Sequence, residues 1–302
     1  MRVNEHLDLG YLLGRIQNGL LPTTGLAVLV TVLWGITGFA WLDITVIPIA
    51  LIGLPVLSLA LAHLAIAYHR FTSAERDWGL FVASVYSLGD AAVSQWLVKG
   101  RSKKPREQRD QFVSRLAALP HVVRAELRGI QSRDDIASLL NDEDIEQLRG
   151  ARSPQLRLLR LIRADVERAV EEEKINGAQY AVLQSHMMSV SQLNTRLTLH
   201  NSTHAPPVLT SLTPMITTGL CLVLPLGLVT TLGWLTPFVV PLVAASVLIP
   251  SAIASSFSHP FGSHSDCLPL YRDCRETEVA LLVLLGQDSL PRNLEPFGGV
   301  VR

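Results

Sequence analysis

Charged residues are scarce in this chain of 302 residues: Asp, Glu, Lys and Arg make up 17% of it, against about 25% in an ordinary soluble domain. Residues 197–265 contain none of the four. A hydrophobic share of 48% and a positive mean hydropathy accompany this deficit. Composition therefore predicts an integral membrane protein. The formal net charge is zero, so no overall field would attract nucleic acid, and we expect no such partner.

Cysteine is rare, and the common catalytic signatures are missing. The three cysteines are odd in number and form no Cys-x-x-Cys pair, so we expect neither a disulfide framework nor structural zinc. His200 and His204 have the i, i+4 spacing of a metal site, but no carboxylate lies near them in the sequence. No P-loop, dinucleotide-binding, nucleophile-elbow or zinc-protease motif occurs. The sequence predicts no enzyme, no cofactor and no metal.

Uncharged runs of membrane-spanning length occupy both ends of the chain. Residues 23–42 and 44–69 give two spans, because about 20 apolar residues cross a hydrocarbon core. The uncharged segment in the second half is too long for one span. Its natural division is the sequence LGWLTP at 232–237, where Gly, an interfacial Trp and Pro coincide. Two further spans are expected at 212–231 and 236–257.

The middle of the chain has the opposite character, since 20 of the 26 basic residues lie between Arg70 and Arg196. Apolar residues recur there at intervals of three and four, which predicts long amphipathic helices over 109–130 and 153–193. Ser153 followed by Pro154 is typical of a capped helix start. We expect the acidic stretch 130–150 to separate the two helices, and 100–109 to form a polar turn.

Basic residues also predict the orientation in the membrane. The short turns around Asp43 and Trp234 contain no Lys or Arg, whereas the N-terminus, the middle and the tail contain all of them. The positive-inside tendency then places both termini in the cytoplasm of a multi-pass protein of the cell membrane. The predicted organisation is 1–69 with two spans, 70–207 as a cytosolic helical region, 208–258 with two spans, and 259–302 as a cytosolic tail.

Three sequence stretches resemble the prokaryotic bestrophin family. LPLGLVTTLGWLTPFVVPLVA at 224–244 is similar to that family's hairpin between the third and fourth spans. HPFGSHSDCLPL at 259–270 resembles its signature after the fourth span, and YHRFTSAERDWGLF at 68–81 is a weaker match to the exit from the second span. The order of two spans, a charged helical middle, two spans and a tail is also the same.

This resemblance implies a homopentameric chloride channel whose central pore is lined by the second helix and narrowed at a hydrophobic neck. Four residues of that helix follow one face at intervals of four, three and four: Leu57, Leu61, Leu64 and Tyr68. The resemblance places Leu64 and Tyr68 at the neck. Residues 255–259 lack the acidic residues that accompany calcium gating in animal members, and Cys267 replaces another, so calcium dependence is not expected.

Four polar residues are candidates for the ends of the pore. His63 lies inside the second span, where ionisable side chains often serve a pathway or a helix–helix hydrogen bond. His69 and Arg70 mark the inner end of that span. Asp43 would form an acidic ring at the outer mouth and favour cations. A channel for monovalent cations and a non-conducting membrane scaffold or receptor therefore stay open as alternatives, with lipids, small inorganic ions and copies of the same chain as expected partners.

Overall fold

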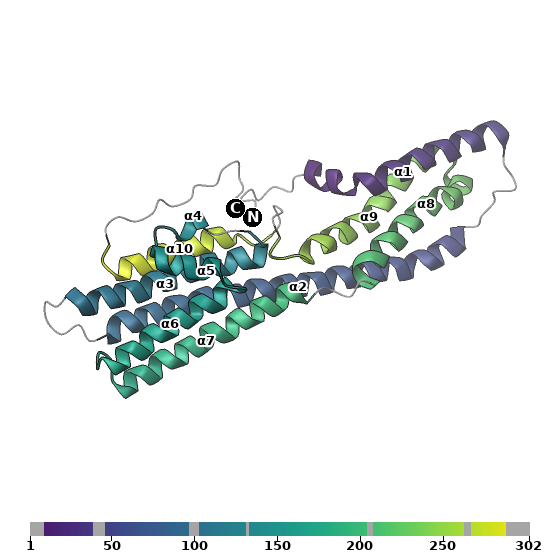
Figure 1. The fold of residues 1–302 in the computed structure, drawn as a ribbon. Coiled ribbons are helices and arrows are strands. Elements are labelled where there is room, and N and C mark those ends of the chain that lie inside the picture. Colours follow the sequence, from purple (N-terminus) through teal and green to yellow (C-terminus); the bar gives the residue numbers. More distant parts are fainter. Residues whose placement is uncertain are drawn as a thin grey trace. The chain divides into compact units, whose positions relative to one another are not determined.

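The structure is a computed structural model, and it describes residues 9–38, 46–96, 103–130, 133–203, 208–262 and 267–287. Within these ranges every regular element is a helix, which confirms the predicted all-α fold. The chain divides into two compact units (Figure 1). We call them the apolar unit, with the described residues of 9–72 and 208–260, and the polar unit, with those of 73–203 and 261–287.

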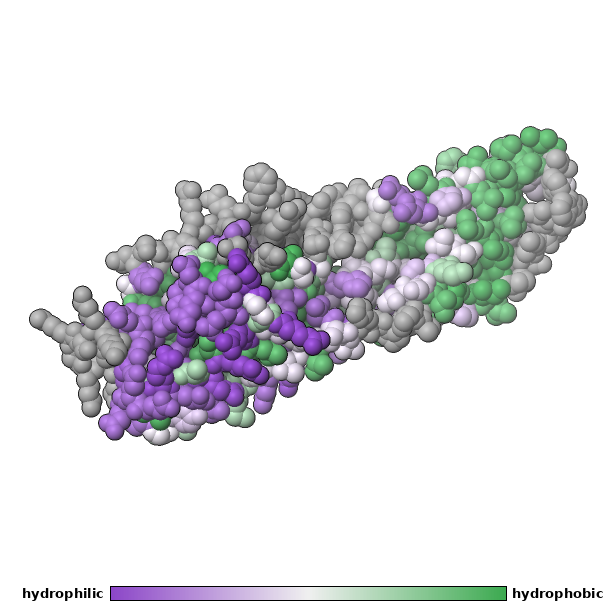
Figure 2. Space-filling view, in the orientation of Figure 1, coloured by the Kyte–Doolittle hydropathy of each residue, from purple (hydrophilic) through white to green (hydrophobic). Residues whose placement is uncertain are grey.

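The apolar unit is a bundle of long helices. It contains α1 (Leu9–Thr37), the first part of α2 (Val46–Gln95), α8 (Thr213–Leu232) and α9 (Thr236–Phe257). α1 packs against both α8 and α9, and a π-helical turn, η2 (Val208–Leu212), leads into α8. Hydrophobic residues cover much of the visible surface of this unit (Figure 2). Such a surface is suited to lipid or to other apolar helices.

The tight connection between α8 and α9 depends on small residues. Gly233 has a φ of +50°, a conformation that L side chains rarely adopt, and it begins the 3₁₀ turn η3 (Gly233–Leu235). Trp34 of α1 lies against Gly233, and a Cβ on Gly35 would come within 2.9 Å of the Trp234 ring. The division predicted within LGWLTP is confirmed, because α8 ends at Leu232 and α9 begins at Thr236.

Three stretches of the described residues have the length and hydropathy of membrane spans: Ile16–Ile36, Leu51–Gln95 and Thr210–Phe257. The third contains both α8 and α9. Four crossings of the membrane stay a prediction, with α1, the first part of α2, α8 and α9 as the spans.

The polar unit is a second helical bundle, to which the C-terminal part of α2 belongs. Its other helices are α3 (Lys103–Arg128), α4 (Arg133–Ile136), α5 (Asp142–Arg149), α6 (Pro154–Glu171), α7 (Gly177–Ser202) and α10 (Leu270–Leu284). α3 is the central helix, since all but one of residues 112–123 are buried and it packs against α6, α7 and α10. Gly89 allows α10 to approach α2, because a Cβ there would lie 2.3 Å from Leu281 Cδ2.

Two helix boundaries differ from the sequence-based expectation. α2 does not end near Arg70 but continues to Gln95, so the polar region begins inside a helix. The helix expected over 153–193 is two helices, separated by a turn in which Glu173 has a φ of +55°. Asn176 then starts α7 with a capping box, exchanging hydrogen bonds with Gln179 at 2.8 and 2.9 Å.

The connections around α3 also differ in detail. α3 already begins at Lys103, so the expected polar turn over 100–109 is largely helical, and the acidic stretch contains the short helices α4 and α5. α6 starts at Pro154 as predicted. Ser153 makes no capping bond, however, because its hydroxyl donates instead to Glu126 Oε1 at 3.0 Å.

Candidate functional site along the second helix

One stripe of α2 faces the interior of its own bundle. Ile49, Val56, Ala60, His63 and Ala67 are all buried, at intervals of seven, four, three and four. This spacing follows a single helical face. In the same unit, Ile49 belongs to a cluster with Ala27, Leu224 and Val240, so α1, α8 and α9 cover this stripe.

The predicted pore residues lie beside the buried stripe, about 100° around the helix from it. Leu61 and Tyr68 are 49% and 56% exposed, whereas Leu57 and Leu64 are partly buried. Leu57 packs against a cluster of buried residues from the other three helices, which consists of Ile16, Cys221, Ala244, Val247 and Leu248. Leu61 and Tyr68 are therefore the members most available to a surface outside the chain.

Aromatic contacts fix the C-terminal end of this segment. The rings of Tyr68 and Phe71 lie 6.1 and 5.0 Å from that of Phe257 at the end of α9, measured between centroids. His69 is exposed between them and Arg70 is partly buried. Tyr68 thus contacts Phe257 while much of its side chain stays exposed.

The ionisable groups described in the apolar unit are mostly basic. They are the side chains of His63, Tyr68, His69, Arg70 and His259, together with the thiol of Cys221. No carboxylate occurs among the residues that the structure describes in this unit. Asp43, the predicted acidic ring, lies outside the described residues. Among the side chains described in this unit, Arg70 carries the one permanent charge, and it is positive.

His63 is a buried polar residue of the apolar unit whose side chain makes no hydrogen bond. Its side chain is 1% exposed, and neither ring nitrogen has a hydrogen-bond partner. It shares the buried stripe of α2 with Ala60 and Ala67, on the side that faces the other helices of the bundle. The structure therefore places His63 inside one chain and separates it from the exposed Leu61 and Tyr68.

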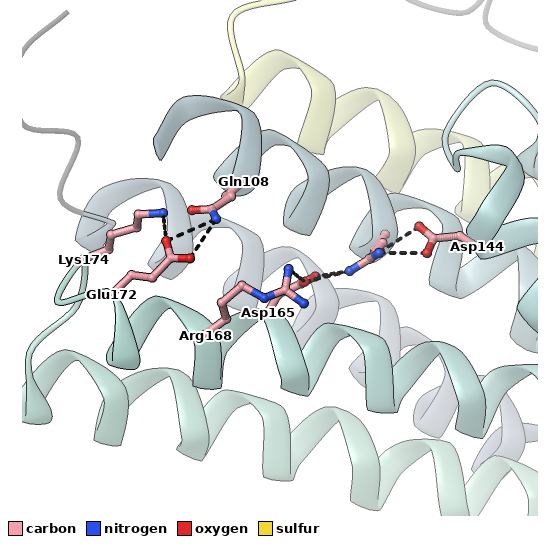
Figure 3. A network of polar contacts seen from close by, with 7 residues as sticks. Gln108, Asp144, Asp165, Arg168, Glu172 and Lys174 are labelled. Atoms are coloured by element: carbon pink, nitrogen blue, oxygen red, sulfur yellow. Dashed lines mark hydrogen bonds and ion pairs between the residues drawn. The ribbon is translucent and has the colours of Figure 1, made fainter. Parts of the chain in front are cut away.

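The polar unit contains buried ion pairs that the sequence did not predict. Arg115 of α3 donates to both oxygens of Asp144 on α5, at 2.7 and 2.9 Å, and to both oxygens of Asp165 on α6, each at 2.7 Å. Figure 3 shows this network, with Arg168 also directed toward Asp165. One guanidinium therefore joins three helices through charge-assisted hydrogen bonds.

A second buried cluster joins α3 to α10. Nε2 of His121 lies 2.9 Å from Oε2 of Glu278, and Arg275 donates to both oxygens of the same carboxylate. On α2, Nε1 of Trp78 donates to Asp273 Oδ2 at 2.8 Å. These contacts hold α10 against the rest of the polar unit.

His200 has a carboxylate partner, which corrects the sequence analysis. Its Nε2 lies 2.9 Å from Oδ2 of Asp77, a residue 123 positions earlier in the chain. Arg196 approaches the other oxygen of Asp77 at 3.9 Å. Among the described residues no group of three or more His, Cys, Asp or Glu side chains is arranged to hold a metal.

None of Cys221, Cys267 and Cys274 forms a disulfide, and all three are buried. Burial raises the pKa of the Cys274 thiol far above its usual range. This thiol is therefore protonated and unreactive at neutral pH.

Known proteins resemble this chain over most of its length. A family model described as Bacterial/Fungal Bestrophin protein matches residues 8–283. A voltage-dependent anion channel-forming protein of Ralstonia nicotianae is 26% identical over 281 residues, which cover 92% of this chain and 90% of that protein. One with the same description from Mesorhizobium japonicum is 27% identical over 223 residues, or 73% and 69% of the two chains.

Solved structures show the same fold. A variant of a bacterial bestrophin homolog from Klebsiella pneumoniae superimposes with a TM-score of 0.84 at 22% identity, covering 90% of this chain and 100% of that one. A structure of the homolog that was phased with zinc has a TM-score of 0.83, also at 22% identity, with 90% and 99% covered.

Proposed function

This chain belongs to the bacterial and fungal bestrophin family, and from that membership we propose that it assembles with copies of itself into a passive channel for small anions. The observation that carries the proposal is that relatives matching nine-tenths of the chain are described as voltage-dependent anion channel-forming proteins. The family is of the channel type and not an enzyme family. The apolar unit, with helices long enough to span a bilayer, makes the chain an integral membrane protein.

The charges of the apolar unit support conduction of anions over cations. Arg70 supplies positive charge, and the described residues of this unit supply no opposing carboxylate. Repeated around a ring of subunits, such basic groups raise the local concentration of anions and exclude cations. Chloride is the ion we propose, because it is the abundant small monovalent anion that such a field would attract.

We place the conducting path along α2, with Leu57, Leu61, Leu64 and Tyr68 facing it and Leu64 and Tyr68 at its neck. The exposure of Leu61 and Tyr68 supports this choice, since these side chains have apolar surface that their own bundle leaves uncovered. Five copies around an axis would bring these surfaces together. A ring of leucines dewets easily, so an ion must lose part of its hydration to pass.

The ends of the path follow from the direction of α2. His69 and Arg70 would lie at the inner end and Asp43 at the outer mouth, with both termini in the cytoplasm. His63 is assigned elsewhere, because it is buried inside its own chain.

Ion flux across the membrane of liposomes that contain the purified protein tests the proposed channel function. Purified protein is reconstituted with a chloride gradient in one preparation and a sodium gradient with an impermeant anion in another. We expect chloride flux that depends on protein and little sodium flux. Sodium flux alone would support the cation channel, and no flux of either ion across a range of voltages would support the scaffold.

Native mass measured in mild detergent tests the pentamer, and a monomer would contradict the shared pore.

A further inference from the structure

His63 is the starting point, because a buried imidazole without partners is unfavourable in the middle of an apolar bundle. Leaving a buried polar group unpaired costs about 1–3 kcal/mol, and buried polar groups in native proteins nearly always have a partner. Both ring nitrogens of His63 are buried without one. A ligand that supplies the partner would remove this penalty.

A second polar group without a partner lies near the same level of the bundle. Thr213, at the start of α8 directly after the π-helical turn, is fully buried, and its hydroxyl makes no hydrogen bond. Ile49 shares a cluster with Leu224, and Gly53 lies next to Leu220, so α2 and α8 run antiparallel. Continuing this register toward the C-terminal end of α2 places Thr213 within about one turn of His63.

The charges around His63 decide which ligand fits. The helices packed against α2 in this unit are α1, α8 and α9. Their described ionisable groups are the thiol of Cys221 on α8 and His259, which follows α9, while α2 adds Tyr68, His69 and Arg70. None of the described groups is a carboxylate. Among the residues described in this unit, a protonated imidazole at this position therefore has no anionic side chain to balance it.

We propose that His63 and Thr213 form a halide-binding site inside the bundle of each chain, and that a halide binds there together with a proton on His63. The imidazolium N–H and the threonine hydroxyl donate to the halide, and the halide neutralises the imidazolium. The proton and the halide are both taken from solution, so the site fills and empties as a neutral pair. Ala60 and Ala67, one turn to either side of His63, carry only a methyl group each and have no polar side-chain atom that could bond to the ring.

This site is distinct from the proposed pore, because it lies on the buried stripe of α2 and not on the exposed face. Its occupancy links the packing of α2 against α8 to chloride concentration and pH. Binding can be measured without ion flow, so failure of the halide site and failure of the channel function give different results.

Thermal unfolding of the full chain in detergent provides the first test. Sodium gluconate is replaced by sodium chloride or bromide at constant ionic strength, between pH 5.5 and pH 8. We expect the halide to raise Tm, with an apparent Kd that weakens by about tenfold per pH unit over the range where one proton is bound with each halide. An affinity that does not change with pH would overturn the coupling.

Two variants locate the site. His63→Gln should lose the Tm shift caused by halide, and Thr213→Val should weaken halide binding by about tenfold, the effect of losing one hydrogen bond to a charge. His186→Gln, which removes a histidine from α7 in the polar unit, should keep the shift. A full halide shift in His63→Gln would refute the proposal.

Diffraction from bromide-soaked crystals of the unmodified protein tests the site without any substitution. An anomalous bromide peak between the His63 ring and the Thr213 hydroxyl is the expected result. Bromide found only elsewhere, at soak concentrations that saturate the Tm shift, would also refute it. Chloride flux from the same preparation reports separately on the channel.

Discussion

In the apolar unit, Thr23, Thr31 and Thr217 each donate to a carbonyl one turn earlier in their own helix, at 2.7 to 2.9 Å. In the polar unit, by contrast, Arg115 reaches carboxylates 29 and 50 residues away. Polar groups in a membrane bundle are best satisfied locally, because the surrounding lipid offers no partners. Packing must therefore determine how apolar helices associate, whereas in the polar unit buried ion pairs join the helices in addition to a hydrophobic core.

The strongest test of this difference between the two units is to remove Arg115. Arg115→Met retains much of the side-chain volume but leaves Asp144 and Asp165 buried without their cation. We expect a loss of about 3–5 kcal/mol in the stability of the polar unit, the usual effect of removing one partner from a buried ion pair. Denaturant unfolding followed by fluorescence of Trp78 and Trp96 measures it.

Arg149→Ala serves as the control, because its ion pair with Glu146 at 3.1 Å is exposed. Surface pairs of this kind contribute about 0–1 kcal/mol. Equal losses in the Arg115 and Arg149 variants would mean that the buried network contributes no more than a surface pair.

The apolar unit should respond to substitution mainly in conduction. Leu64→Ala shortens the proposed neck, so we expect a several-fold increase in single-channel conductance or a channel that stays open. Leu59→Ala is the matched control, since position 59 lies about 140° around the helix from position 64. Conductance unchanged in both well-folded variants would show that this face of α2 does not line the pore.

Local patterns in the sequence were sufficient to predict the long apolar helices and the turn between α8 and α9. Uncharged runs predicted the long apolar helices, and Gly233 and Pro237 marked the turn between α8 and α9. α2 was predicted too short because Arg70 and Arg76 resemble the end of a span. Its apolar periodicity nevertheless continues through Trp78, Phe81 and later residues into the polar unit.

The contacts between distant residues could not be predicted from one sequence. Nothing local distinguishes Asp144 and Asp165, which bind Arg115, from the exposed acids around them. His200 and Asp77 are separated by 123 residues, and only the fold brings them together. The pore positions on α2 came from a family resemblance combined with periodicity, and they stay predictions until conduction is measured.

The pH dependence of stability tests a buried carboxyl of the polar unit. Burial raises the pKa of the Asp273 carboxyl above its ordinary value of 3.8, although the hydrogen bond from Trp78 opposes the shift. The folded protein therefore binds this proton more tightly than the unfolded chain does. Its stabilising contribution is present below pH 3.8 and is lost as the pH rises through the folded pKa.

Asp273→Asn should remove this part of the pH dependence, so that Tm falls less steeply between about pH 4 and the folded pKa. Asp90→Asn, which makes the same change at an exposed residue of α2, is the control. Melting curves at half-unit pH intervals compare the three proteins. An unchanged slope in Asp273→Asn would show that burial does not perturb this carboxyl.

The smallest effect is expected where the polar unit, like the apolar unit, satisfies its groups locally. Asn176 caps α7 by accepting from the Gln179 backbone N–H at 2.9 Å, and both residues are close to the surface. Asn176→Ala should cost about 1 kcal/mol, because it removes one cap and buries no charge. Ser153→Ala tests the contrast, since that hydroxyl bonds to Glu126 of another helix and leaves α6 uncapped. If long-range pairs hold this unit together, denaturant unfolding should show a far larger loss of stability for Arg115→Met than for Asn176→Ala. A loss in Asn176→Ala as large as that in Arg115→Met would mean that local capping, and not the ion network, sets the stability of the polar unit.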